Sequence, residues 1–346
     1  MKMGLRWYGP GYDSVSLEQI RQIPGVTGVI TTLYGKQPGE VWEREEIRAL
    51  KDAVSQKGLQ ILGIESVNVS DAIKIGTKDR DRHIEHYIRT LSNLAAEGIH
   101  MVCYNFMPVF DWTRSELSRK RADGSFVLAY DQDVIDRIDP ERMKESVEKM
   151  SDGFIMPGWE PERLDRLKEL FDQYRDVDAG RLFQNLIYFL EAIGPVCEKN
   201  EIRMGIHPDD PAWPIFGLPR IGKESILRIL KAVDKPYNGI TFCTGSLGSN
   251  PENDLLEIIR ACRGRIPFAH IRNLKYNSPR DFEEAAHLSS DGSLDLYQII
   301  KTLYETGFDG VIRPDHGRMI WGEKAMPGYG LYDRALGAGY LEGLWE

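Results

Sequence analysis

The stretch RMGIHPDD (203–210) is a short β-rich run that passes directly into residue types able to bind a metal. Three later stretches repeat this form, namely GITFCTG (239–245), PFAHIRN (267–273) and GVIRPDHG (310–317). Amphipathic helical stretches separate the four runs, and this alternation is typical of parallel strands joined by helical crossovers. The second half of the sequence therefore predicts an α/β fold built on a parallel sheet.

The same alternation extends to the N-terminus, so that the predicted strands are Gly4–Tyr8, Val26–Leu33, Gln60–Glu65, Met101–Phe106, Arg203–His207, Gly239–Cys243, Pro267–Ile271 and Asp309–Arg313. The stretch 226–233 has the apolar spacing of an amphipathic helix. Gly58, Gly98 and Gly307 precede strands and fit left-handed helix C-caps. Eight such units fit one closed (β/α)8 barrel, the TIM barrel, which takes about 250 residues. A doubly wound open sheet is the alternative.

A barrel of that size leaves room for an insertion in the 346 residues, which we expect to form one domain (1–346). The stretch from Asp111 to about Pro161 (111–161), after the fourth strand, is polar and has a possible β-hairpin around Ala122–Ser125. Loops at this end of a barrel strand surround the active site. We therefore expect the insertion to serve either as a partial lid or as a contact in a homo-oligomer, a dimer or larger.

Composition narrows the classes of partner. The formal net charge is -9 at pH 7, without a basic stripe, so we expect no binding to nucleic acid. The first residues have no apolar signal core and no later run approaches a membrane span, so we expect a cytoplasmic protein without a membrane contact. The cysteines lack CxxC spacing, which suits a reducing compartment and excludes a disulfide scaffold or a zinc finger.

Metal-ligating residue types end four consecutive predicted strands. The carboxyl ends of barrel strands converge on one face, which would bring together His207, Cys243, His270 and Asp315. A single strand-end cysteine or histidine is more often a structural residue, but four together indicate a metal site. Two imidazoles, a thiolate and a carboxylate would neutralise a divalent ion and leave a position open for substrate. The soft thiolate by itself favours zinc or iron.

Several long sequence motifs resemble those of a known family. They are RWYGP (6–10), IHPDDP (206–211), FCTGSLG (242–248), AHIRN (269–273), RPDHG (313–317) and MPGYGLYDRALG (326–337). From the first strand to the C-terminus, the sequence resembles the mannonate dehydratase family of hexuronate (glucuronate) breakdown. The resemblance implies a xylose-isomerase-like barrel, Mn²⁺ or Fe²⁺ as cofactor, and conversion of D-mannonate to 2-keto-3-deoxy-D-gluconate.

Dehydration of a sugar acid needs a general base and a general acid, and His316 and Tyr329 are the candidates. His316 directly follows Asp315, and an imidazole exchanges protons near neutral pH. Tyr329 lies in a glycine-rich segment that could bring its phenol over the site. The assignment of acid and base stays open. Alternatively, His316 orients Asp315 and Tyr329 is a packed loop aromatic.

Polar residues at or just beyond strand ends are candidates for binding the substrate carboxylate and hydroxyls. They are Arg6, Trp7, Arg272, Asn273, Lys275 and Arg313. Arginine matches a carboxylate in a bidentate manner, although each of these residues could instead form a structural ion pair. His83 and His86 mimic a metal pair, but their charged neighbours predict a solvated helix face.

Three other functions remain open at the level of sequence. A sugar isomerase or epimerase on the same barrel could use a similar metal set and would differ in where the proton is returned. A metal-dependent endonuclease of related fold should carry a basic groove, which this acidic chain lacks. A metal-stabilised carbohydrate-binding protein would need no acid-base pair.

Overall fold

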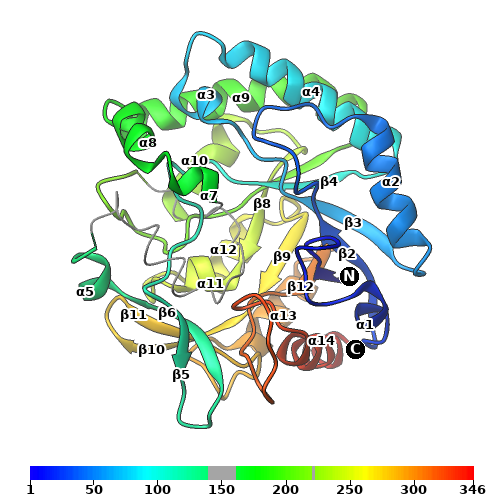
Figure 1. The fold of residues 1–346 in the computed structure, drawn as a ribbon, viewed down its shortest axis with the longest axis vertical. Coiled ribbons are helices and arrows are strands. Elements are labelled where there is room, and N and C mark those ends of the chain that lie inside the picture. The colour runs from blue at the N-terminus through cyan, green and yellow to red at the C-terminus, as the bar shows by residue number, and fades with distance from the viewer. Residues whose placement is uncertain (139–160, 220–222) are drawn as a thin grey trace.

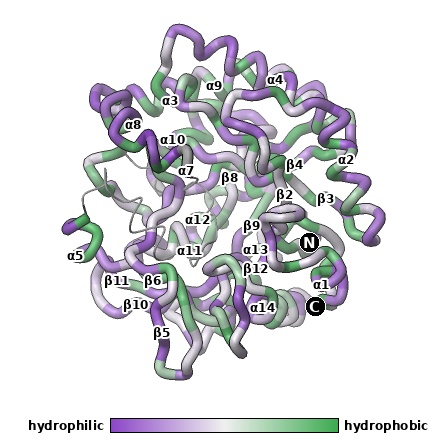
Figure 2. The backbone as a smooth tube through the Cα atoms, in the orientation of Figure 1, coloured by the Kyte–Doolittle hydropathy of each residue, from purple (hydrophilic) through white to green (hydrophobic). Residues whose placement is uncertain are grey.

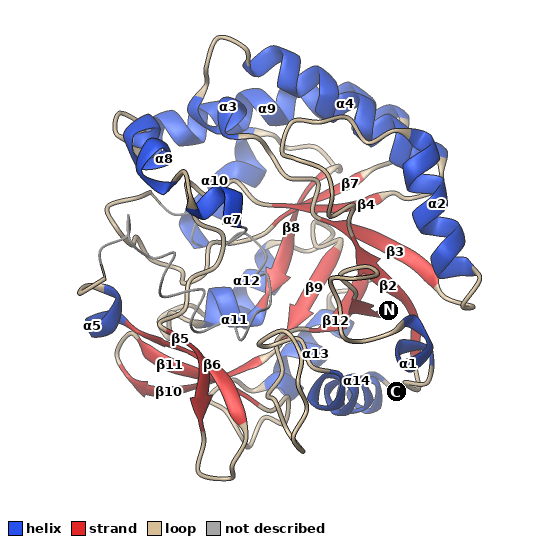
Figure 3. Cartoon of the chain, in the orientation of Figure 1, coloured by secondary structure: helices blue, strands red, loops and turns tan. Residues whose placement is uncertain are grey.

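The computed structural model describes residues 1–138, 161–219 and 223–346. In these residues eight parallel strands close into a barrel (Figure 1, Figure 3). They are β1 (Lys2–Arg6), β2 (Val26–Thr31), β3 (Gln60–Glu65), β4 (Met101–Tyr104), β7 (Arg203–Ile206), β8 (Asn238–Cys243), β9 (Phe268–Ile271) and β12 (Val311–Pro314). The predicted barrel strands are confirmed, and because β1 pairs with both β2 and β12 the alternative of an open sheet is wrong.

Helices surround the barrel (Figure 3). Their bounds are α1 (Leu17–Arg21), α2 (Arg44–Ser55), α3 (Asp71–Ile75), α4 (Arg80–Ala96), α5 (Gln132–Ile135), α7 (Pro161–Leu164), α8 (Leu167–Tyr174), α9 (Ala179–Lys199), α10 (Lys223–Ala232), α11 (Thr244–Gly248), α12 (Leu255–Ala261), α13 (Leu296–Glu305) and α14 (Leu331–Trp345). The outer helices alternate hydrophilic and hydrophobic residues along their length (Figure 2), as expected where one face packs on the barrel.

Local chemistry fixes where several helices begin and end. Asp178 and Asp295 accept hydrogen bonds from backbone N–H groups in the first turns of α9 and α13, which satisfies donors that the helix leaves free. Gly58, Gly98 and Gly307 have φ of +73°, +79° and +75°, so the predicted left-handed turns before three strands are confirmed.

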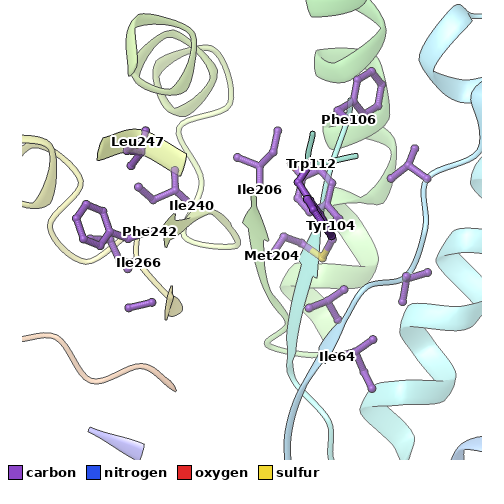
Figure 4. Close-up of a cluster of buried hydrophobic side chains, with 14 of the residues drawn as sticks. Ile64, Tyr104, Phe106, Trp112, Met204, Ile206, Ile240, Phe242, Leu247 and Ile266 are labelled. Carbon is purple, nitrogen blue, oxygen red and sulfur yellow. The ribbon is translucent and has the colours of Figure 1, made fainter. Parts of the chain in front are cut away.

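The hydrophobic core has two parts. The larger one lies between the barrel and its helices and includes Ile64 of β3, Met204 of β7 and Ile240 of β8 (Figure 4). The smaller one gathers Ile30, Met101, Cys103, Phe268 and Val311. These residues come from β2, β4, β9 and β12, which include strands from separate parts of the barrel wall, so the cluster fills the barrel interior. Full burial of such a side chain contributes about 1.5–3 kcal/mol. The filled interior closes the barrel beneath the site.

A second sheet of four antiparallel strands stands beside the barrel (Figure 3). Its order is β10 (Asn273–Ser278), β11 (Asp281–Ala285), β6 (Phe126–Asp131) and β5 (Glu116–Lys120). The hairpin predicted around Ala122–Ser125 is confirmed as the turn between β5 and β6, whereas the β10–β11 hairpin was not predicted. Residues 139–160 of the insertion lie outside the described residues, so its role as lid or oligomer contact stays a prediction.

None of the helices in the described ranges combines the length and the apolar character needed to cross a membrane.

Candidate active site and metal centre

A cavity of about 850 Å³ lies at the carboxyl ends of the barrel strands. This volume falls in the range of small-molecule sites, about 300–1,000 Å³. Its lining includes residues at or next to the ends of β1, β3, β7, β9 and β12, among them Arg6, Glu65, His207, His270 and Arg313. The cavity therefore occupies the face on which a TIM barrel carries its chemistry.

Three of the predicted metal ligands meet, and two of them, His207 and His270, line this cavity. His207 directly follows β7, Cys243 ends β8 and His270 lies in β9, and their ligand atoms all lie within 4.8 Å of one another. The Nε2 atom of His207 is 3.2 Å from Nδ1 of His270. Two ligands of one ion, each bonded at about 2.0–2.3 Å, lie up to about 4.6 Å apart. The donor set and its spacing thus fit a divalent transition metal.

The Cys243 sulfur is held as a thiolate. Burial alone would raise the pKa of this thiol, but the charge of Arg272 and hydrogen bonds from His207 and His270 hold it well below 9.0. Ser246 also donates its backbone N–H and its hydroxyl to the sulfur, at 3.4 and 3.1 Å. In return, and against the effect of burial, the thiolate raises the pKa of His207 to about 9. A metal would replace this shared proton.

Gly245 explains how Arg272 comes so close to Cys243. A Cβ at Gly245 would lie 2.0 Å from Nε of Arg272, so a side chain there would displace the guanidinium. The arginine packs into this space, with Nη2 3.9 Å from the Cys243 sulfur and Nε 3.0 Å from Oδ2 of Asp315. The glycine after Cys243 is therefore required by the close approach of the arginine to the site.

Asp315, the fourth predicted ligand, lies beside the other three. Its Oδ2 is 3.8 Å from the Cys243 sulfur, and Nη1 of Arg313 is 2.7 Å from its Oδ1. Burial acts to raise the pKa of Asp315, but Arg313 and other cations hold it well below its usual range. The carboxylate therefore stays ionised at the edge of the cluster.

The predicted acid-base pair is in direct contact. Nε2 of His316 lies 2.9 Å from the Tyr329 hydroxyl, and both side chains line the cavity. Burial, followed by the charge of Asp315, raises the pKa of Tyr329, so its phenol keeps its proton at neutral pH. Tyr8, which ends the predicted first strand, also hydrogen bonds to Tyr329. A chain of exchangeable hydrogens thus borders the metal cluster.

Three of the six predicted substrate-binding residues, Arg6, Arg272 and Arg313, line the cavity. The Nη1 atom of Arg6 is buried and has no hydrogen-bond partner in the part of the chain that the structure describes. The guanidinium of Arg272, by contrast, is engaged by Asp210, Glu284 and Asp315. The Nη1 atom of Arg6 is 4.0 Å from Oε2 of Glu65, beyond hydrogen-bond distance, so Arg6 has a donor that is available to a ligand.

The other three, Trp7, Asn273 and Lys275, do not line the cavity, and we leave them out of the proposed site. Successive side chains along a strand point to opposite faces, so Trp7 packs in the core while its neighbours face the cavity. The chain leaves the barrel after β9 and enters β10. Asn273 there binds the backbone of Leu288 and Leu294, and Lys275 is exposed.

His83 and His86 are themselves half-buried, although their charged neighbours Asp81, Arg82 and Glu85 are exposed, as predicted for a solvated face. Nδ1 of His86 is 2.8 Å from the carbonyl oxygen of Gly39, and His83 lines the outer cavity 3.4 Å from Asp79. The charged residues next to them in α4 face solvent. The local composition did not distinguish these exposed residues from the half-buried histidines.

Two groups of functional residues were missed from the sequence. Glu65 ends β3 and contacts both His270 and Arg313, at 3.5 and 3.1 Å. The strand-end criterion that selected the metal ligands would have selected it, had it been applied to the third strand. The second group is a buried ring of charges made by Arg114, Asp210, Arg272 and Glu284.

The buried ring links the second sheet to the acid-base pair. Arg114 lies 2.9 Å from Asp210 and 2.8 Å from Oε1 of Glu284, while Arg272 contacts both carboxylates. The same Oε1 atom of Glu284 is 3.2 Å from Nδ1 of His316. Glu284 comes from β11, so the second sheet supplies a carboxylate directly behind the predicted catalytic histidine.

The sequence and the structure were compared with known proteins. All of residues 1–346 match the family model described as D-mannonate dehydratase (UxuA). The chain belongs to the D-mannonate dehydratase family. The family suggested by the sequence words is thereby confirmed.

Relatives of this mannonate dehydratase family match over essentially their whole length. A mannonate dehydratase from Brachyspira hyodysenteriae is 62% identical, over 100% of this chain and 98% of the relative. The crystal structure of the mannonate dehydratase from Streptococcus suis serotype2 matches with a TM-score of 0.89 and 42% identity, over 100% of this chain and 94% of that one. A xylose isomerase domain protein from Planctomyces limnophilus, 12% identical with a TM-score of 0.56 over 99% and 96% of the two chains, shares the fold.

Proposed function

We propose that this chain dehydrates D-mannonate to 2-keto-3-deoxy-D-gluconate in hexuronate breakdown, with a divalent metal bound by His207, Cys243, His270 and Asp315. Family membership supports the reaction. The observation that carries the proposal is the joint placement of a metal-ligating cluster and the His316–Tyr329 pair in one cavity. A protein that only binds sugars has no need of the second feature.

We propose Mn²⁺ or Fe²⁺ as the metal, following the family resemblance. The thiolate also suits zinc, so the donor set supports a divalent transition metal in general. When bound, such an ion polarises the carboxylate and 2-hydroxyl of a sugar acid and lowers the barrier to loss of the proton at C2. The neighbouring Asp315 carboxylate stays ionised and is oriented by Arg313 and Arg272.

Arginine side chains at the cavity are proposed to bind the substrate carboxylate. Nη1 of Arg6 is buried without a hydrogen-bond partner among the residues that the structure describes, and an unpaired buried donor is stabilised by an anionic acceptor. Arg313 lies in the same cavity wall, with its charge shared between Glu65 and Asp315. Arg6 thus supplies a donor that makes no hydrogen bond among the described residues, and Arg313 contributes positive potential.

We assign Tyr329 as the general acid and His316 as the general base. The phenol is protonated because burial raises its pKa, so it can deliver a proton to the 3-hydroxyl as the C3–O bond breaks. His316 takes the proton from C2, and the electron pair of that bond forms the C2=C3 double bond of an enol. The imidazolium then returns the proton to the phenolate across the 2.9 Å contact. The enol released becomes the 2-keto acid.

The proposal is tested by product analysis. Metal-depleted protein is incubated with D-mannonate, with and without Mn²⁺ or Fe²⁺, and formation of the 2-keto-3-deoxy acid is followed. We expect product only when metal is added. Isomeric products without loss of water would instead support an isomerase or epimerase, and binding of mannonate without turnover would support a carbohydrate-binding protein.

We further propose that the enzyme works in the cytoplasm as a homo-oligomer. The buried free cysteines Cys103, Cys197, Cys243 and Cys262 support a reducing compartment. For the polar insertion after β4 we propose one of two roles, a partial lid or the contact between subunits. Sedimentation of the purified protein tests the oligomeric state.

A further inference from the structure

The His270 ring faces two different environments through its two nitrogen atoms. On one side, Nδ1 lies 3.2 Å from Nε2 of His207 and 3.4 Å from Nη2 of Arg313. On the other side, Nε2 lies 3.5 Å from Oε2 of Glu65. The proposed metal cluster is therefore on the Nδ1 side, and a buried carboxylate is on the Nε2 side.

Neither atom of the Glu65–His270 contact has another hydrogen-bond partner among the described residues. Both Oε2 of Glu65 and Nε2 of His270 are buried and lie 3.5 Å apart, while Nη1 of Arg6 is farther from Oε2, at 4.0 Å and beyond hydrogen-bond distance. A buried carboxylate oxygen without a donor is costly, and a protonated imidazole nitrogen is the donor that faces it. Arg313 offers N–H groups to the Nδ1 side of the ring and none to its Nε2 side, which favours the same arrangement.

Glu65, Cys103 and His270 also have ligand atoms within 4.8 Å of one another and could suggest a second metal site. The state of the thiol argues against it. Burial raises the pKa of the Cys103 thiol, so unlike Cys243 it keeps its proton, and Glu65 is already paired with Arg313 at 3.1 Å and Arg6 at 4.0 Å. Glu65 therefore acts through its contact with the His270 imidazole and not as a metal ligand.

We propose that Glu65 is a positioning residue that holds His270 with its proton on Nε2, so that the lone pair of Nδ1 points at the metal. This inference rests on the proposed metal site. A carboxylate that accepts the distal N–H of a ligating histidine fixes the tautomer and the ring orientation, and it makes the other nitrogen a better ligand.

Arg313 extends this arrangement to the fourth ligand. Its Nη2 pairs with Oε1 of Glu65 and its Nη1 pairs with Oδ1 of Asp315. One guanidinium thus fixes both the carboxylate that orients His270 and the carboxylate that completes the ligand set. Glu65 acts on the metal through His270 and Arg313 without touching it.

The test compares Glu65→Gln with a matched control, Glu97→Gln. Glu97 is also a buried carboxylate between two arginines, Arg44 and Arg48, but it does not line the cavity. Mn²⁺ affinity is measured by calorimetry on metal-depleted protein, and thermal unfolding of each metal-free variant verifies the fold. Loss of the orienting carboxylate should weaken Mn²⁺ binding by about 10–100-fold, while Glu97→Gln should bind as the parent does.

A second measurement uses the unaltered protein. In Zn²⁺-loaded protein with ¹⁵N-labelled histidine, NMR should show His270 with its proton on Nε2. A proton on Nδ1, or Mn²⁺ binding by Glu65→Gln as tight as by the parent, would overturn the positioning role while leaving the metal site in place. Failure of the parent itself to bind Mn²⁺ would instead remove the proposed metal centre and this inference with it.

Discussion

Glu65 and Glu97 have similar surroundings in two different regions of the molecule. Each is a largely buried carboxylate between two arginines. Glu65 ends β3 and lines the cavity, whereas Glu97 follows α4 and precedes β4, in the layer of helices. We therefore expect the same pairing of a carboxylate with two arginines to support metal binding at Glu65 and stability at Glu97. We expect the position of an ion pair, at the carboxyl ends of the strands or among the outer helices, to decide which of the two roles it has.

The largest expected effect comes from the metal cluster at those strand ends. Cys243→Ser removes the thiolate that two imidazoles and Arg272 stabilise. Loss of metal assistance worth several kcal/mol should lower kcat/KM by about 10³-fold or more. Metal content and turnover are measured together. Cys262→Ser is the control, because Cys262 is buried at the end of α12 outside the cavity, and it should keep its metal.

Tyr329→Phe should have the next largest effect. It removes the phenolic proton that is 2.9 Å from His316 but leaves the metal ligands intact. Loss of one acid-base group costs about 10²–10⁴-fold, and the loss should appear in kcat with metal affinity unchanged. Tyr332→Phe, at a partly exposed position three residues later, serves as the control. If kcat of Tyr329→Phe stays within a few-fold of the parent, Tyr329 is not the acid.

Glu284→Gln tests whether the second sheet contributes to turnover, as the residues at the cavity do, or only to stability, as expected for Glu97 in the helix layer. Glu284 is fully buried and pairs with Arg114, Arg272 and His316. Breaking such a buried network should destabilise the fold by about 3 kcal/mol and should also lower kcat. Chemical unfolding and turnover are measured on the same sample. Glu116→Gln, in a more exposed pair on β5, should cost less than about 1 kcal/mol. Unchanged kcat in Glu284→Gln would show that the sheet is structural only.

The smallest effect is expected for Glu97→Gln, which should change the pH dependence of the free energy of unfolding only at acidic pH. Hydrogen bonds from Arg48 and Arg44 lower the pKa of Glu97 from 4.5 to about 2 in the folded protein. A carboxylate with a lowered folded pKa stabilises the fold above its unfolded pKa, and this stabilisation is lost as the pH falls toward 2. Glu97→Gln should therefore flatten the fall of stability between about pH 4.5 and pH 2. Unfolding curves over this range provide the measurement, and parallel curves for parent and variant would contradict the assignment.

The barrel was predictable because its evidence is periodic. Each strand lies between an amphipathic helix and a turn, and the ligand types recur at the strand ends. The meeting of His207, Cys243 and His270, and the position of His316 at the cavity, therefore follow from the fold. The rule that site residues lie at strand ends did not predict which of two adjacent side chains faces the cavity and which faces the core. Arg6 and Trp7 are adjacent, and only alternation of side chains sends one to the cavity and the other to the core.

The second sheet was harder to predict for a physical reason. The strands β10 and β11 are short and are interspersed with charged residues, so they carry little of the hydrophobic alternation that marks a strand. β10 pairs with β11, and β11 pairs in turn with β6, which lies about 150 residues earlier in the chain. Glu284 lies in β11 and becomes buried only when this sheet forms. No local pattern in the sequence indicates that this glutamate will be buried. The buried ring therefore had to be found in three dimensions.

The central claim is that the strand-end residues form one metal centre. Crystals of the protein soaked with Mn²⁺ and measured at the manganese absorption edge would locate the ion by its anomalous scattering. The account predicts a peak between Nε2 of His207, Nδ1 of His270, the sulfur of Cys243 and the carboxylate of Asp315, with Glu65 outside its coordination sphere. A peak bound by Glu65 and Cys103 instead, or no peak at the cavity in folded protein, would contradict it.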